Sequence, residues 1–157
     1  MKYLLVIDLQ REFVKDQQGE LIYQKCLKYI NDNRIKYDSI IAAAYQNGYN
    51  VNMQRYLGYA GCMKTPTIEF QPDYSNIHSG YSMPVYPQVT INDQIDIIGF
   101  DTDACVLSAA FDVFNLGCGL KILSNLCWSS GGKDCHLHGL AIMSRQFGKA
   151  LDMEIDI

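Results

Sequence analysis

Short apolar runs alternate with amphipathic segments along this chain, and this alternation most limits the folds open to it. The apolar runs have the length of β-strands and cover residues 2–7, 39–45, 94–100 and 120–126. Apolar residues recur at roughly helical spacing over residues 21–35, 103–116 and 134–147. Strands that alternate with helices form a mostly parallel sheet with helices on both faces. We therefore expect one three-layer α/β domain over residues 1–157, with a Rossmann-like topology.

The middle and the end of the chain give weaker signals. Apolar positions over residues 53–60 suggest one short helix before Gly61. The stretch from Pro66 to Pro87 holds all 4 prolines of the chain, which favours a loop with one short strand near residues 74–78. Residues 153–157 are a candidate for a last edge strand.

Composition and charge argue against several classes of function. A net charge of -4 and the lack of a Lys/Arg run give no basic face for nucleic acid. The first apolar run is short and closes at Asp8, unlike a signal peptide or a membrane span. We expect a cytoplasmic protein with no nucleic-acid or membrane partner. Without such a signal, the 6 cysteines are expected to be reduced thiols, and no C-x-x-C pair supports a zinc site.

One cysteine occupies a position that suits a nucleophile. Cys105 follows the apolar run 94–100 and lies at the start of the helical segment 103–116, in its first turn. A thiol at a helix N-terminus lies at the positive end of the helix dipole, which stabilises its thiolate. A cysteine buried only for packing is the alternative interpretation, and it does not need this position.

Two further reactive side chains are expected at the same edge of the sheet. Asp8 closes the first strand, and His78 closes the short strand near residues 74–78. Ligands of open α/β sheets bind beyond the carboxyl ends of the strands. We therefore expect Asp8, His78 and Cys105 to converge there.

These segments resemble the isochorismatase-like cysteine hydrolases, a family that includes nicotinamidases, N-carbamoyl amidases and ureido-hydrolases. Residues 5–13, LVIDLQREF, are similar to the opening strand of the family and its catalytic aspartate. Residues 99–107, GFDTDACVL, resemble the nucleophile segment. Residues 129–132 together with His136 and Gly139 resemble the last loop and helix.

The resemblance implies a catalytic role for Asp8 and Cys105, no cofactor, and a homodimer or larger homo-oligomer. It also implies a non-proline cis peptide, with Phe100–Asp101 as its place here. The oxyanion of the reaction is expected to meet backbone N–H groups at Asp101 and Cys105.

Aromatic side chains are the candidates for contact with a small-molecule substrate. We assign this role to Phe13, Tyr45 and Tyr81. Packing is the alternative for the two tyrosines, because the chain has 11 residues of this type.

The chain departs from the family pattern in two places. The family has a catalytic lysine three positions before a Tyr-Ser pair, and here that position is His78. His78 either supplies positive charge as an imidazolium, acts as the base itself, or is a surface residue without a role. The second departure concerns metal: residues 45–52 contain no histidine or carboxylate, so a nicotinamidase-type metal site is not expected.

Three functions fit these residues. The first is metal-independent hydrolysis of a C–N bond in a small amide or carbamoyl-type substrate, through a thioester on Cys105. The second is a catalytically degenerate member that binds a small molecule or a protein partner. The third is isochorismatase-type hydrolysis of a vinyl ether, which needs the aspartate but no thiol nucleophile.

Overall fold

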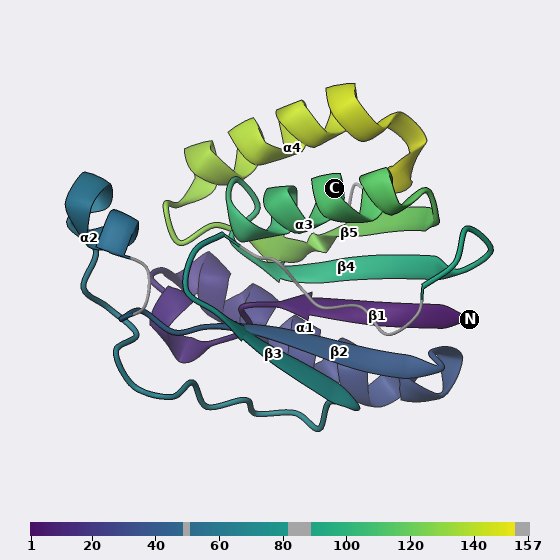
Figure 1. Cartoon of the computed structure of the whole chain (residues 1–157), viewed down its shortest axis with the longest axis horizontal. Coiled ribbons are helices and arrows are strands. Elements are labelled where there is room, and N and C mark those ends of the chain that lie inside the picture. Colours follow the sequence, from purple (N-terminus) through teal and green to yellow (C-terminus); the bar gives the residue numbers. More distant parts are fainter. Residues whose placement is uncertain (49–50, 82–88, 153–157) are drawn as a thin grey trace.

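Six parallel strands form one continuous sheet in the computed structural model, which describes residues 1–48, 51–81 and 89–152 (Figure 1). The strands lie in the order β3-β2-β1-β4-β5-β6. Their bounds are β1 Lys2–Ile7, β2 Ser39–Tyr45, β3 Tyr74–His78, β4 Gln94–Phe100, β5 Gly119–Trp128 and β6 Leu151–Asp152. The main helices of the described ranges are α1 Gln17–Asn33, α2 Val51–Leu57, α3 Cys105–Leu116 and α4 Lys133–Phe147.

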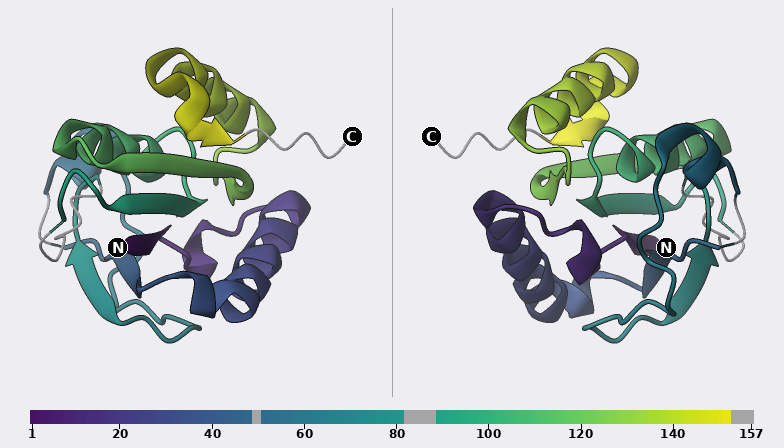
Figure 2. Two further views of the ribbon diagram at one scale, coloured as in Figure 1. Left: turned by 90° about the vertical axis from the view of Figure 1, so that its right-hand side faces the viewer. Right: turned by 90° about the vertical axis from the view of Figure 1, so that its left-hand side faces the viewer.

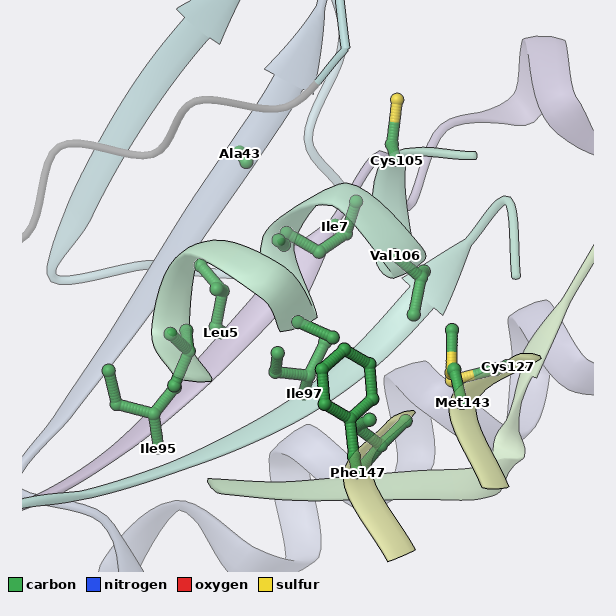
Figure 3. Close-up of a cluster of buried hydrophobic side chains, with 14 of the residues drawn as sticks. Leu5, Ile7, Ala43, Ile95, Ile97, Cys105, Val106, Cys127, Met143 and Phe147 are labelled. Carbon is green, nitrogen blue, oxygen red and sulfur yellow. The ribbon is translucent and has the colours of Figure 1, made fainter. Parts of the chain in front are cut away.

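Helices cover both faces of this sheet, as the alternation of strands and helices predicts (Figure 2). Leu4 and Val6 of β1 point to one face and pack with residues of α1. Leu5 and Ile7 point to the other face, where they belong to a cluster that α3 and α4 complete (Figure 3). Because β1 is buried on both faces, its sequence is a continuous apolar run. The three-layer α/β fold is confirmed.

Most element boundaries agree with the sequence. The first four strands have the predicted bounds, while β5 extends beyond its predicted range at both ends. Helix α1 begins before the first periodic residue, because Asp16 caps it by accepting a hydrogen bond from the Gly19 N–H at 2.6 Å. Helix α3 begins at Cys105, two residues later than predicted. The expected strand over 153–157 lies outside the described residues, and β6 ends just before it.

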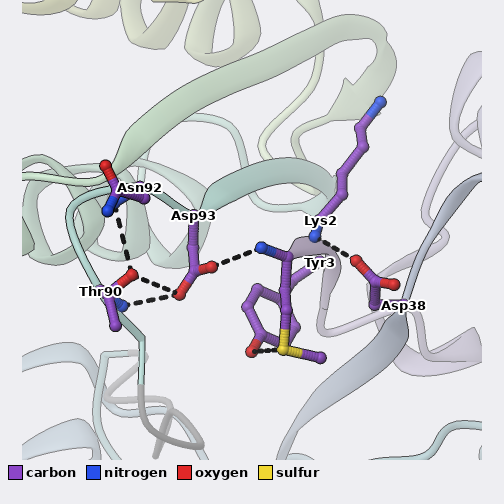
Figure 4. A network of polar contacts seen from close by, with 7 residues as sticks. Lys2, Tyr3, Asp38, Thr90, Asn92 and Asp93 are labelled. Atoms are coloured by element: carbon purple, nitrogen blue, oxygen red, sulfur yellow. Dashed lines mark hydrogen bonds and ion pairs between the residues drawn. The ribbon is translucent and has the colours of Figure 1, made fainter.

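The two ends of the sheet differ in their use of polar groups. At the amino ends of the strands, the Lys2 N–H donates to Asp38 at 2.6 Å, and the Thr90 N–H donates to Asp93 at 2.7 Å (Figure 4). These carboxylates precede β2 and β4, so they fix the turns from which those strands start. At the carboxyl ends, α2 lies beyond the strands, at the left in Figure 1.

Two expectations about the whole chain can be compared with the structure. All six cysteines are among the described residues, and no disulfide joins any two of them. Within the described ranges, no helix combines the length and apolar character needed to cross a membrane.

Candidate active site

Asp8 is held at the carboxyl end of the central strand β1. Its backbone has a φ of 46°, and its N–H donates to the Ala43 carbonyl of β2 at 2.8 Å. On the other side, Gly99 of β4 pairs with Ile7, the residue before Asp8. A Cβ on Gly99 would lie 2.0 Å from the Ile7 carbonyl oxygen, so only glycine allows the two strands to approach here. The backbone therefore fixes where the Asp8 carboxyl lies.

His78 ends β3, and both of its ring nitrogens have hydrogen-bond partners. Nε2 lies 2.6 Å from Oδ1 of Asp8, and Nδ1 lies 2.9 Å from the Gly80 carbonyl oxygen. Because a carbonyl oxygen only accepts, Nδ1 carries a hydrogen. His78 is level with Tyr45 of the neighbouring strand, and the two rings meet edge to face at 5.6 Å. The side chain is thus held in one orientation, toward Asp8.

Cys105 completes the group as the first residue of α3. Its sulfur points away from the hydrophobic cluster beneath it (Figure 3). Sγ of Cys105, a carboxylate oxygen of Asp8 and a ring nitrogen of His78 all lie within 4.8 Å of one another. The three side chains that the sequence assigns to one edge of the sheet do meet there.

Burial and charge act on this group in opposite directions. Burial raises the pKa of Asp8. The hydrogen bond with His78, the charge of His78 and the hydrogen bond with Cys105 each lower this pKa, but together they offset only part of the rise. Burial would lower the pKa of His78, but the hydrogen bond and charge of Asp8 outweigh it, and the pKa is raised. Oδ2 of Asp8 is buried, and Cys105 is the second side chain that interacts with this carboxyl. The carboxylate thus depends on His78 for its main stabilisation.

A cavity of about 280 Å³ opens beside Cys105. Phe13, Tyr45 and Tyr81, the three aromatic residues selected from the sequence, all line it. The ring of Tyr45 also packs edge to face on Phe13, with centroids 6.1 Å apart. Asp101, selected from the sequence for its backbone, also lines it, and residues that the sequence did not select complete the wall: Met53, Leu57, Tyr59, Ala104 and Ser130. Met53 and Leu57 belong to α2, and Tyr59 follows it by two residues. This part of the chain carries no recognisable motif.

Asp101 contributes its side chain as well as its backbone to this region. The sequence assigned only its backbone N–H. In the structure the residue lines the cavity, and its carboxylate accepts hydrogen bonds from the N–H and Oγ of Ser130, at 2.8 and 2.6 Å. Burial raises the pKa of Asp101 to about 6. The Phe100–Asp101 peptide bond is cis, as the resemblance implies. The Asp101 carbonyl accepts from the N–H groups of Ala104 and Val106, which shapes the turn into α3.

Gln10 is a structural residue of the site that sequence reasoning missed. Its Nε2 donates to the Tyr45 carbonyl at 2.9 Å, and its Oε1 accepts from the Tyr45 N–H at 2.7 Å. The side chain is buried, so this pair of bonds ties the segment after Asp8 to the end of β2. A glutamine two residues after a strand-ending aspartate was the available signal.

A larger hollow, of about 1030 Å³, lies over the amino-terminal ends of α1 and α4. Trp128 and His136 line it, and Nδ1 of His136 is 2.7 Å from Oγ1 of the buried Thr102. None of Asp8, His78 and Cys105 lines this hollow. The cavity beside Cys105 is therefore the candidate active site.

Comparison with known proteins finds similar structures but no similar sequence among family models or curated proteins. No family model and no curated protein matches the sequence. Solved structures do match. A nicotinamidase from Bacillus subtilis has a TM-score of 0.72 at 17% identity, covering 96% of this chain and 98% of that one. An N-carbamoylsarcosine amidase from Thermoplasma acidophilum has a TM-score of 0.72 at 14% identity, covering 99% and 98%.

A third match carries the name that the sequence motifs suggested. An isochorismatase-like hydrolase from Alkaliphilus metalliredigens has a TM-score of 0.67 at 22% identity, covering 92% of this chain and 90% of that one. The three similarities extend over nearly the full length of each chain. This protein therefore has the isochorismatase-like α/β fold.

Proposed function

We propose that this protein is a cysteine hydrolase that cleaves the C–N bond of a small amide or carbamoyl-type substrate. The observation that carries the proposal is the meeting of Cys105, Asp8 and His78 within 4.8 Å, beside a cavity of about 280 Å³. Two proteins of the same fold are an amidase and a nicotinamidase by name, which supports amide hydrolysis in general.

Acylation begins when Asp8 accepts the thiol proton of Cys105 and the sulfur attacks the carbonyl carbon of the substrate. The carbonyl oxygen takes the negative charge, and backbone N–H groups at Cys105 and Asp101 are the proposed donors to it. Asp8 then gives its proton to the leaving nitrogen. The C–N bond breaks, and ammonia or an amine leaves behind a thioester on Cys105.

Deacylation runs through the same groups. A water molecule attacks the thioester carbon while Asp8 accepts one of its protons. The C–S bond breaks, the acid product leaves, and the proton returns to the sulfur. Burial suits Asp8 to this exchange, because its raised pKa favours taking up a proton between steps.

Between the two catalytic roles open to His78, the hydrogen bonds favour the cationic one. Nδ1 donates to the Gly80 carbonyl, and Nε2 faces Asp8, so neither nitrogen is left to accept the Cys105 proton. With Asp8 ionised, both nitrogens carry hydrogen and the ring is an imidazolium. We propose that this charge stabilises the Asp8 carboxylate and the Cys105 thiolate.

The proposal is tested by a screen for ammonia release from small primary amides and N-carbamoyl compounds. We expect the wild type to turn over at least one of them and Cys105→Ser to lose the activity. Cys135→Ser is the matched control, since Cys135 is a partly exposed cysteine that does not line the cavity. Equal rates for wild type and Cys105→Ser would exclude a thiol mechanism, and vinyl-ether hydrolysis that survives Cys105→Ala would favour the isochorismatase-type reaction.

His78→Lys tests the role of the histidine. A lysine brings a permanent charge near Asp8, so we expect turnover to be retained or raised if the imidazolium acts through its charge. Loss of turnover in this variant, with the fold intact by circular dichroism, would instead identify the imidazole as the working base.

A further inference from the structure

We propose that Asp8, His78 and Cys105 also form a binding site for Zn²⁺, and that the bound ion blocks the catalytic centre. A carboxylate oxygen, an imidazole nitrogen and a thiolate sulfur are the three ligand types that Zn²⁺ takes in proteins. Here one of each lies within 4.8 Å of the other two. The three residues are far apart in the sequence, so no metal-ligand spacing in the sequence indicates the site.

The distances suit one ion after movements of about 1 Å. Zinc–ligand bonds of about 2.0–2.3 Å at a tetrahedral angle put neighbouring donor atoms about 3.4 Å apart. The Asp8 Oδ1 to His78 Nε2 distance of 2.6 Å must therefore lengthen by less than about 1 Å. Asp8 also has a second carboxylate oxygen, Oδ2, which is buried and offers the ion an alternative ligand atom.

The surroundings of His78 match those of a zinc-binding histidine. Such a histidine binds the metal through one nitrogen and donates its other N–H to a carbonyl or carboxylate, which fixes the tautomer. In this protein Nδ1 donates to the Gly80 carbonyl at 2.9 Å, and Nε2 is the nitrogen that faces Asp8. The neutral tautomer that this bond selects has its lone pair on Nε2, the nitrogen that faces Asp8.

Charge and access complete the site. The Asp8 carboxylate and the Cys105 thiolate together balance the two charges of the ion. Cys105 lines the cavity, which leaves a path for the ion and a fourth position for water. This site differs from a nicotinamidase-type metal site, because its ligands do not come from residues 45–52. The inhibition, unlike the binding, rests on the proposed function: coordination takes the sulfur and the carboxylate that the hydrolysis requires.

The first experiment uses the unaltered protein and iodoacetamide. We expect Zn²⁺ to slow alkylation of Cys105 at least about tenfold, and EDTA to restore it, because a coordinated sulfur is a poor nucleophile. Peptide mass spectrometry then reads Cys135 of the same chain as the internal control, which Zn²⁺ leaves unprotected. Equal alkylation rates of Cys105 with and without Zn²⁺ would overturn the proposal.

The second experiment uses Co²⁺ as a spectroscopic substitute for Zn²⁺. We expect one equivalent per chain to give a sulfur-to-cobalt charge-transfer band that Zn²⁺ abolishes by competition. Removing a ligand in Cys105→Ser or His78→Lys should lose the band, while Cys135→Ser keeps it. A band that persists in Cys105→Ser would place the metal elsewhere and refute the site.

Binding and catalysis fail separately in these tests. Protection of Cys105 with no amide turnover would retain the metal site and reject the hydrolase. Turnover that Zn²⁺ does not inhibit, with no charge-transfer band, would retain the hydrolase and reject the metal site.

Discussion

Replacing His78 with alanine should destabilise the fold in a way that grows with pH. The side chains of Asp8 and His78 are only 1% and 8% exposed. His78 is the main hydrogen-bond partner of the Asp8 carboxylate, at 2.6 Å. In His78→Ala that carboxylate stays buried without a counter-charge. Removing one member of a buried ion pair costs about 3–5 kcal/mol. This is a large part of the roughly 5–15 kcal/mol that stabilises a typical domain.

The sign of the pH dependence follows from the direction of the shift at Asp8. Burial already raises the pKa of Asp8 above its ordinary value of 3.8, and loss of His78 raises it further. The folded variant therefore holds a proton that the unfolded chain releases. Its free energy of unfolding falls as pH rises from about 4 through the raised pKa of Asp8. At lower pH the carboxyl is neutral, and the penalty shrinks.

The assay is urea denaturation at pH 5 and pH 7.5, followed by the fluorescence of Trp128, the single tryptophan, which is buried at the end of β5. His138→Ala is the matched control: His138 is an exposed histidine, so its loss should change stability by less than about 0.5 kcal/mol. Adding Asp8→Asn to His78→Ala should remove the pH dependence. A loss below about 1 kcal/mol at pH 7.5, or an equal loss at pH 5, would refute the reasoning.

Two further predictions concern the backbone and the cavity. Gly99→Ala should lower the free energy of unfolding, measured by urea denaturation, by more than about 3 kcal/mol, because φ is 125° and the new Cβ would lie 2.0 Å from the Ile7 carbonyl oxygen. Gly117→Ala is the control. Its φ is 77° and the space around it is open, so it should lower the free energy of unfolding by only about 1 kcal/mol. Asp101 has a pKa of about 6 in the folded state and 3.8 as its ordinary value, so between these pH values the folded state holds a proton that the unfolded chain has released. The free energy of unfolding should therefore fall as pH rises from 3.8 to about 6. Asp101→Asn should flatten this part of the profile while its amide keeps hydrogen bonds with Ser130; an unchanged slope would show that Asp101 is not its source.

The sequence alone was sufficient for the layer architecture and for the edge of the sheet at which Asp8, His78 and Cys105 meet. The central strands β1, β2 and β4 are buried on both faces, so they are mostly apolar runs whose ends are visible in the sequence. Parallel strands have their carboxyl ends at one edge, and this property alone predicts that Asp8, His78 and Cys105 come together. Helix starts were less well predicted, because caps such as Asp16 precede the first periodic residue.

Tertiary structure decided how these side chains engage one another. The role proposed for His78 depends on Gly80 and Asp8 occupying its two nitrogens, which is a matter of side-chain direction rather than of sequence spacing. The hydrogen bonds of Gln10 with Tyr45 and of Asp101 with Ser130 each join segments about 30 residues apart, and no local sequence pattern marks such pairs. Apolar periodicity reports which face of an element is buried, whereas the contacts between Asp8, His78 and Cys105, and the pKa shifts they cause, arise where distant segments meet.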